Sequence, residues 1–211
     1  MEFISEKDFR NEEFWNSLTH FIGVILTVLG IPLLFYFDNK FTSLSTLSII
    51  LFSFGLFSVY SSSSVYHFVI NPRLKKRLQI LDHISIYYLI AGSYAPVCLI
   101  TLLDMSGLYI FGVVSLIALF GTFFKLFYTG RYEKLSLFLY LFMGWLVIID
   151  IKTLFEVIEF NGFLLLILGG ASYSIGTIFY SLDKKYAHTV WHLFVLAGST
   201  LHFFFILFYI I

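Results

Sequence analysis

The chain has 211 residues, of which 59% are hydrophobic and 12% are charged, and its formal net charge is zero. A soluble domain carries roughly 25% charged residues, so this composition excludes an ordinary soluble fold and places the protein in a membrane. The sequence contains no basic tract interleaved with aromatic residues, so we expect membrane lipids as partners and no nucleic acid. It indicates no particular protein partner.

Seven apolar segments follow one another along the chain. About 20 apolar residues in a helix cross a hydrocarbon core of roughly 30 Å. The segments are too continuous for the alternating strands of a barrel, and helices satisfy their own backbone in lipid. We therefore predict an all-α integral membrane protein, a seven-transmembrane helical bundle forming a single domain over 1–211, with spans at about 18–37, 45–70, 81–102, 107–127, 135–154, 162–181 and 188–211.

The fifth of these segments is the least continuous, because Asp150 and Lys152 interrupt its apolar run. Seven spans also divide the basic residues unevenly. Of the 13 Lys and Arg residues, only Lys40 and Lys152 fall on the side opposite the N-terminus, which leaves 11 on the N-terminal side. Basic residues concentrate in cytoplasmic flanks. We therefore predict a multi-pass protein of the cell (plasma) membrane with its N-terminus cytoplasmic and its C-terminus outside.

Histidines gather at the predicted cytoplasmic ends of the spans. Five of the six fall at one depth, whereas His202 lies deeper. An ionisable residue inside a span is costly enough that a functional role is its default interpretation. The five are His20, His67, His83, His188 and His192.

The spacing of two of these histidines predicts a metal site. His188 and His192 are at i and i+4, so both imidazoles project from one helical face. A third imidazole from a neighbouring helix would complete a three-histidine site with an open fourth position, the pattern of catalytic zinc. His67 and Asp82 lie at the same depth, and a carboxylate there could hold a water or act as general base.

A plainer interpretation stays open for each of these residues. Histidine is tolerated at a membrane interface, and an Asp at a helix start is a common cap. A serine such as Ser63, which lies four residues before His67, can also serve helix–helix hydrogen bonding without a metal. His20 and His83 are interpreted as structural or interfacial residues rather than ligands.

The sequence resembles the hemolysin III family, the bacterial branch of the progestin and adiponectin receptor superfamily. Five segments spread over the chain carry the resemblance: EFWNSLTHFIG at 13–23, SSVYH at 63–67, LDHISIYYLIAGSYAP at 81–96, YLFMGW at 140–145 and HTVWHLFVLAGSTLH at 188–202. The last, with its H-x-x-x-H pair and a third histidine ten residues on, is the most specific.

The resemblance implies a seven-span bundle with a cytoplasmic N-terminus and a zinc site near the cytoplasmic side. In the animal receptors and the similar alkaline ceramidases, three histidines bind zinc beside an Asp and a Ser. Carried over, the Zn2+ ligands are His67, His188 and His192, and the catalytic pair is Asp82 and Ser63. The implied activity is hydrolysis of a lipid amide or ester, as in ceramide.

Three functions are therefore weighed: a zinc-dependent intramembrane lipid hydrolase, a non-catalytic membrane sensor or regulator with a structural zinc, and a pore-forming cytolysin. The third fits poorly, because the spans are constitutively apolar and no amphipathic segment is available for release into water. An Asp82→Asn variant separates the first two, since turnover needs the carboxylate and structural zinc does not.

Overall fold

The computed structural model describes the backbone of residues 6–211 and the side chains of residues 10–211. Over this part of the chain the regular elements are all helical. Seven helices are long and apolar enough to cross a membrane, and together they confirm the predicted seven-span α-helical class. They are α1 (Glu6–Phe37), α2 (Ser45–Phe68), α3 (Pro72–Pro96, continued by a π-helical turn, Val97–Thr101), α4 (Gly107–Tyr128), α5 (Glu133–Gly144) with α6 (Ile151–Val157), α7 (Phe160–Tyr180) and α8 (Ala187–Tyr209).

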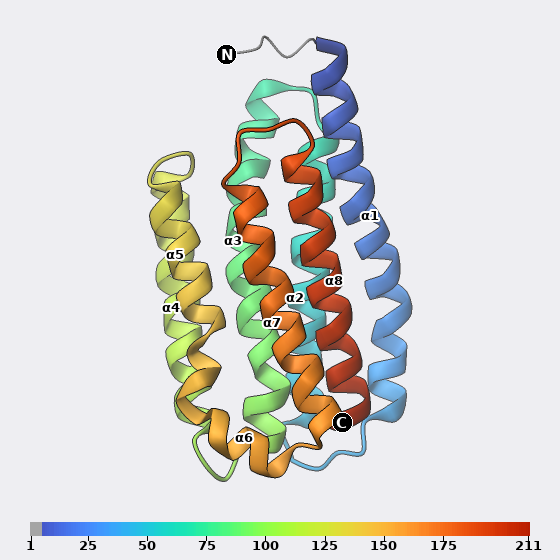
Figure 1. The fold of residues 1–211 in the computed structure, drawn as a ribbon, viewed down its shortest axis with the longest axis vertical. Helices are drawn as coiled ribbons and strands as arrows, with labels where there is room; N and C mark the ends of the chain where they lie inside the picture. The colour runs from blue at the N-terminus through green and yellow to red at the C-terminus, as the bar shows by residue number, and fades with distance from the viewer. Residues whose placement is uncertain (1–5) are drawn as a thin grey trace.

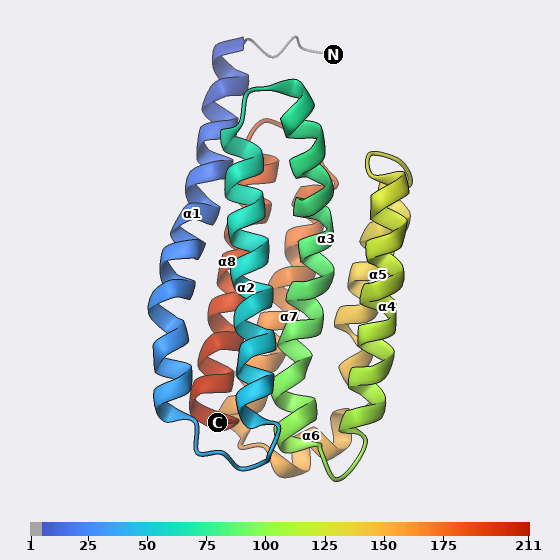
Figure 2. The ribbon, with the colours of Figure 1, turned by 180° about the vertical axis from the view of Figure 1, so that it is seen from behind.

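The helices run roughly parallel to the long axis of the molecule, and the two described ends of the chain lie at opposite ends of the bundle (Figure 1). Neighbours in contact are α1 with α2 and α8, α2 with α3, and α7 with α8. The α4–α5 hairpin stands at the edge of the bundle, where α4 contacts α3 and α5 contacts α3 and α7 (Figures 1 and 2). The interior at the N-terminal end is therefore enclosed by α1, α2, α3, α7 and α8.

Glycines allow α2 and α3 to approach closely. A Cβ atom added at Gly55 would lie 2.6 Å from the backbone oxygen of Tyr88, and one added at Gly92 would lie 2.7 Å from that of Leu51. Association of helices in lipid depends on such close packing, since lipid offers no hydrophobic drive between them. The α2–α3 pair thereby places the end of α2 beside the start of α3, where Asn71 caps α3 by accepting from the backbone N–H groups of Arg73 and Leu74.

The fifth span is broken where α5 ends. A 3-10 segment, Leu146–Asp150, separates α5 from α6. The Tyr94 hydroxyl donates to the Gly144 carbonyl at 2.8 Å and accepts from the Val147 N–H at 2.8 Å, so one side chain satisfies two backbone groups at the break. Asp150, which interrupts the apolar run in the sequence, accepts from the hydroxyls of Ser106 and Thr153. Side chains therefore supply hydrogen-bond partners to the backbone and to Asp150 where the span is broken.

Replacing Tyr94 by Phe should destabilise the bundle, because it leaves the Gly144 and Val147 backbone groups unpaired inside the protein. A buried group left without its partner costs about 1–3 kcal/mol. Thermal unfolding of the purified protein in detergent measures the loss. Tyr88→Phe is the matched control, since its hydroxyl lies 3.5 Å from Thr122. Equal stability of the two variants would contradict the role of the Tyr94 hydroxyl as hydrogen-bond partner of the Gly144 and Val147 backbone groups.

Candidate metal centre

Three histidines converge at the N-terminal end of the bundle. One ring nitrogen from each of His67, His188 and His192 lies within 4.8 Å of the other two. The ring centroids are 5.1 Å apart for His67 and His188, 5.0 Å for His67 and His192, and 4.6 Å for His188 and His192. The last turn of α2 supplies one ring and the first two turns of α8 supply the others. The structure thus brings together the three residues expected to bind the metal.

The unpaired ring nitrogens of the cluster suit a metal ion. The Nε2 atoms of His67 and His188 are buried and have no hydrogen-bond partner among the described residues. Buried polar atoms are rarely left unpaired in native proteins, and a missing ion is one of the standard explanations. Neutral imidazole is a preferred ligand of zinc and of other borderline divalent ions. The residues present therefore fit the divalent metal that the sequence predicts.

Two rings of this cluster, those of His67 and His192, have partners on their Nδ1 atoms that orient them. The His67 Nδ1 atom lies 3.1 Å from Glu13 Oε2, and the His192 Nδ1 atom lies 3.0 Å from the backbone oxygen of Asn16. A carbonyl oxygen can only accept, so His192 carries its hydrogen on Nδ1 and keeps the lone pair of Nε2 for a ligand. Ligating histidines almost always make such a bond from their second nitrogen.

Most of these partners come from one face of α1. Glu13, Asn16 and His20 are spaced i, i+3 and i+7, so they follow one stripe of the helix. Asn16 also accepts, through its side-chain oxygen, from the Thr189 hydroxyl at 2.5 Å. Thr19 Oγ1 lies 3.3 Å from His192 Nδ1. Helix α1 is therefore the support of the candidate metal centre.

Sequence reasoning assigned no role to Glu13, Asn16 or Thr19. The signal that could have found them is a polar stripe at helical spacing within a span that is otherwise apolar. His20 was expected to be structural or interfacial. Its side chain is only 3% exposed and stacks on His192 with ring centroids 3.6 Å apart, so burial excludes the interfacial role.

Asp82 and Ser63 lie beside the histidines. Asp82 starts the apolar part of α3 and is 8% exposed, and Ser63, one turn before His67, is buried. Ser63 is a hydrogen-bond partner of the Asp82 carboxylate. Both side chains line the same cavity as His188 and His192. All five residues expected at the site are thus close together.

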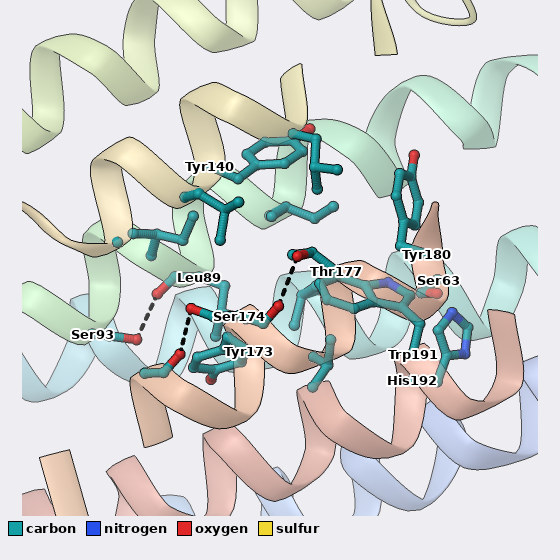
Figure 3. Close-up of a pocket in the computed structure, with 18 of the residues that line it drawn as sticks. Ser63, Leu89, Ser93, Tyr140, Tyr173, Ser174, Thr177, Tyr180, Trp191 and His192 are labelled. Atoms are coloured by element: carbon teal, nitrogen blue, oxygen red, sulfur yellow. Dashed lines mark hydrogen bonds between the residues drawn. The ribbon is translucent and has the colours of Figure 1, made fainter. Parts of the chain in front are cut away.

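A cavity of about 120 Å³ extends from this site between α3, α5, α7 and α8. Figure 3 shows Ser63 and His192 at one end and Leu89 and Ser93 at the other. Hydroxyls in its wall are already used within their own helices: Ser93 donates to the Leu89 carbonyl at 2.8 Å, and Ser174 donates to that of Gly170 at 2.9 Å. The wall away from the histidines therefore offers mainly apolar and aromatic contacts.

Comparison with known proteins agrees with this geometry. The family model for haemolysin-III related proteins matches residues 9–203. The chain belongs to the haemolysin III family. It is 42% identical over 200 residues to the Hemolysin-3 homolog of Bacillus subtilis (strain 168), covering 94% of each chain, and 39% identical over 205 residues to Hemolysin-3 of Bacillus cereus, covering 96% of this chain and 94% of the relative.

A more distant relative is the monocyte to macrophage differentiation factor of Homo sapiens, 27% identical over 196 residues, covering 90% of this chain and 80% of the relative. These matches confirm the resemblance seen in the five sequence segments. Together with the seven apolar helices they confirm the predicted location as a multi-pass protein of the cell membrane.

A second polar network lies next to the site of this haemolysin III protein. The Lys125 ammonium is fully buried and lies 2.8 Å from Glu133 Oε2, and Glu133 Oε1 accepts from the Gly130 N–H at 2.8 Å. His83 Nδ1 lies 3.7 Å from the same Glu133 oxygen. His83 therefore lies between the α4–α5 hairpin and the central cavity, whose wall it shares with Asp82 and His188. Its structural role stays a prediction.

Replacing Glu13 by Gln should weaken zinc binding by about 10–100-fold, the usual cost of losing a carboxylate that orients a ligating histidine. Zinc affinity is measured on detergent-purified protein by competition with a chromophoric chelator. Glu12→Gln is the matched control, because the Glu12 carboxylate accepts from the Tyr186 backbone N–H and not from a histidine. Unchanged affinity in Glu13→Gln would contradict the proposed orientation of His67.

Proposed function

We propose that this member of the haemolysin III family is a zinc-dependent intramembrane hydrolase acting on an amide or ester of a membrane lipid. One observation carries the proposal. Three imidazoles with buried, unpaired Nε2 atoms on two of them converge beside a buried carboxylate, at one end of a mainly apolar cavity. His67, His188 and His192 would hold the ion, and three protein ligands leave one tetrahedral position open.

A bound zinc ion would supply Lewis-acid activation of a water molecule and of a carbonyl group. Asp82 would accept the proton that the water loses; the proposal is supported by its lining the same cavity as His188 and His192. Ser63 donates to that carboxylate and so orients it. In the overall reaction the water oxygen bonds to the carbonyl carbon, the bond to nitrogen or ester oxygen breaks, and Asp82 returns its proton to the leaving group.

The lining of the cavity favours a lipid as the substrate. Its polar groups gather at the histidine end, whereas Leu89, Tyr140, Trp191 and other apolar or aromatic side chains form the remaining wall. An acyl chain would lie along that wall and bring its carbonyl group to the histidines. Apolar walls also exclude bulk water, which strengthens electrostatic interactions inside the site.

A second function, a non-catalytic sensor of membrane lipids, is favoured by the position of the cavity beside the candidate metal centre. A cavity that holds a lipid beside a metal centre could report on lipid state without turnover, and the zinc would then be structural. The names of the compared relatives denote a hemolysin and a differentiation factor, and neither name denotes a hydrolase. A pore-forming cytolysin, the third hypothesis, needs a polar conduction path, which the mainly apolar cavity wall does not favour.

Zinc content tests the metal centre. The purified wild type should contain about one zinc per chain, and His188→Ala should remove most of it, because two imidazoles bind far more weakly than three. Elemental analysis by mass spectrometry of protein purified without metal supplementation gives the ratio. His202→Gln is the matched control, since His202 Nε2 bonds to the Leu166 backbone oxygen outside the cluster. A folded wild type that neither contains nor takes up zinc would refute the proposal.

The Asp82→Asn variant separates hydrolase from sensor. It should keep its zinc and lose turnover by about 100-fold or more, as expected for loss of a general base. Turnover is followed by mass spectrometry of a defined panel of ceramides, amides and esters in mixed micelles before and after incubation. Ser63→Ala should show a smaller loss. Wild type that binds zinc and leaves the whole panel intact would favour the sensor.

A further inference from the structure

A second and larger recess lies on the outside of the bundle, between α1 and α2. Figure 2 shows these two helices side by side at the end where α1 begins. Its volume is about 770 Å³, and α1, α2 and the start of α3 form its walls. Phe14, Leu18 and Phe21 line one side, and Val65 and Phe68 line the other. We call this recess the outer groove. The three-histidine cluster contributes to both recesses, because His67 lines the groove whereas His188 and His192 line the central cavity.

The chemistry of the outer groove matches a phospholipid. Its apolar side chains face outward, with Phe68 and Ile70 each 79% exposed, so in a membrane they contact acyl chains. Arg10 and Lys75 line the same groove. The carboxylate in the groove, Glu13, is already bonded to Lys75 and His67. With His67 neutral, two cations and one carboxylate give the residues that line the groove a formal charge of +1, which favours an anionic headgroup.

Lys75 links the outer groove to the metal centre. Its ammonium donates to Glu13 Oε2 at 2.5 Å and to the Tyr66 backbone oxygen at 3.1 Å, and it lies 4.5 Å above the Tyr66 ring. The same Glu13 oxygen accepts from His67 Nδ1 at 3.1 Å. Lys75 and His67 thus share one carboxylate oxygen, and whatever draws Lys75 away leaves that oxygen to His67 alone.

We propose that the outer groove binds one anionic phospholipid, with its phosphate held by Lys75 and Arg10 and an acyl chain along Phe14, Leu18 and Phe21. Binding moves the Lys75 ammonium from Glu13 to the phosphate. The carboxylate then bonds more strongly to His67 and makes its imidazole a better metal ligand. This second step rests on the metal centre of the proposed function, whereas the lipid site itself does not.

Lipid preference tests the groove. Detergent-purified protein is titrated with phosphatidylglycerol or phosphatidylcholine of identical acyl chains, and bound lipid is counted by native mass spectrometry. Phosphatidylglycerol should bind more tightly, and Lys75→Gln should weaken it about fivefold, as expected for one cation at the membrane surface. Lys76→Gln removes the same charge one residue away, outside the groove, and should change affinity little. Lys75→Arg should restore the preference.

Two results would overturn the groove as an anionic-lipid site: equal affinity of the wild type for both lipids, or equal loss in Lys75→Gln and Lys76→Gln. The proposed effect of the lipid on the metal centre is tested by measuring zinc affinity of the protein in nanodiscs of each lipid. Zinc should bind the wild type several-fold more tightly in phosphatidylglycerol, and Lys75→Gln should bind it equally in both lipids. Lipid-only nanodiscs correct for zinc held by the bilayer itself.

The two proposals fail in different ways. A wild type with the lipid preference but the same zinc affinity in both lipids would overturn the link through Glu13 and leave the groove intact. A wild type that binds no zinc in either lipid would refute the proposed metal centre, while the lipid titration would still decide the groove.

Discussion

A polar group inside a hydrocarbon layer has no water molecule as a hydrogen-bond partner, so it must bond to another group of the protein. The arrangement of this bundle follows from that constraint. Several of its polar side chains bond to neighbouring helices, and a group of them meets where the N-terminal end of α1 packs against the end of α2 and the start of α8. The Tyr94 hydroxyl serves the same need at the broken fifth span. Among the buried polar atoms that lack a partner in the described residues, the Nε2 atoms of His67 and His188 belong to the three-histidine cluster.

Helix α1 orients two rings of the three-histidine cluster. Glu13 and Asn16 bond to the Nδ1 atoms of His67 and His192, and one nitrogen of each of the three rings lies within 4.8 Å of the other two. The α1–α2 contact that makes this possible is itself polar, since Ser17 donates to the Ser64 backbone oxygen at 2.9 Å and Ser64 donates to that of Ser17 at 3.2 Å. A helix that presents much of its surface to lipid therefore organises the candidate site.

The histidine cluster contributes to two recesses of different character. The central cavity is narrow and suits the acyl chain of a reacting lipid, whereas the outer groove opens to the bilayer and carries cationic side chains. His67 and its partner Glu13 line the groove, whereas His188 and His192 line the cavity. Under the two proposals, this metal centre would take its substrate from the central cavity and would respond to the lipid bound in the outer groove.

The sequence by itself determined the spans and part of the site. The bilayer thickness sets the length of an apolar helix, so hydropathy alone predicts seven, and helical geometry alone places His188 and His192 on one face. The charge-based orientation of the termini stays a prediction. That His67 meets this pair was indicated by depth and resemblance, and the structure supplies the contact.

Only the tertiary structure decided the roles of Glu13, Asn16 and Lys75. A polar stripe on a span shows that the helix has a preferred face, but not which neighbour that face meets. That choice depends on the packing of α1 against α2 and α8, through contacts between residues 47 to 176 positions apart. Local periodicity carries no information about such distant pairs, so these partners and the groove beside them emerge only once the helices are packed.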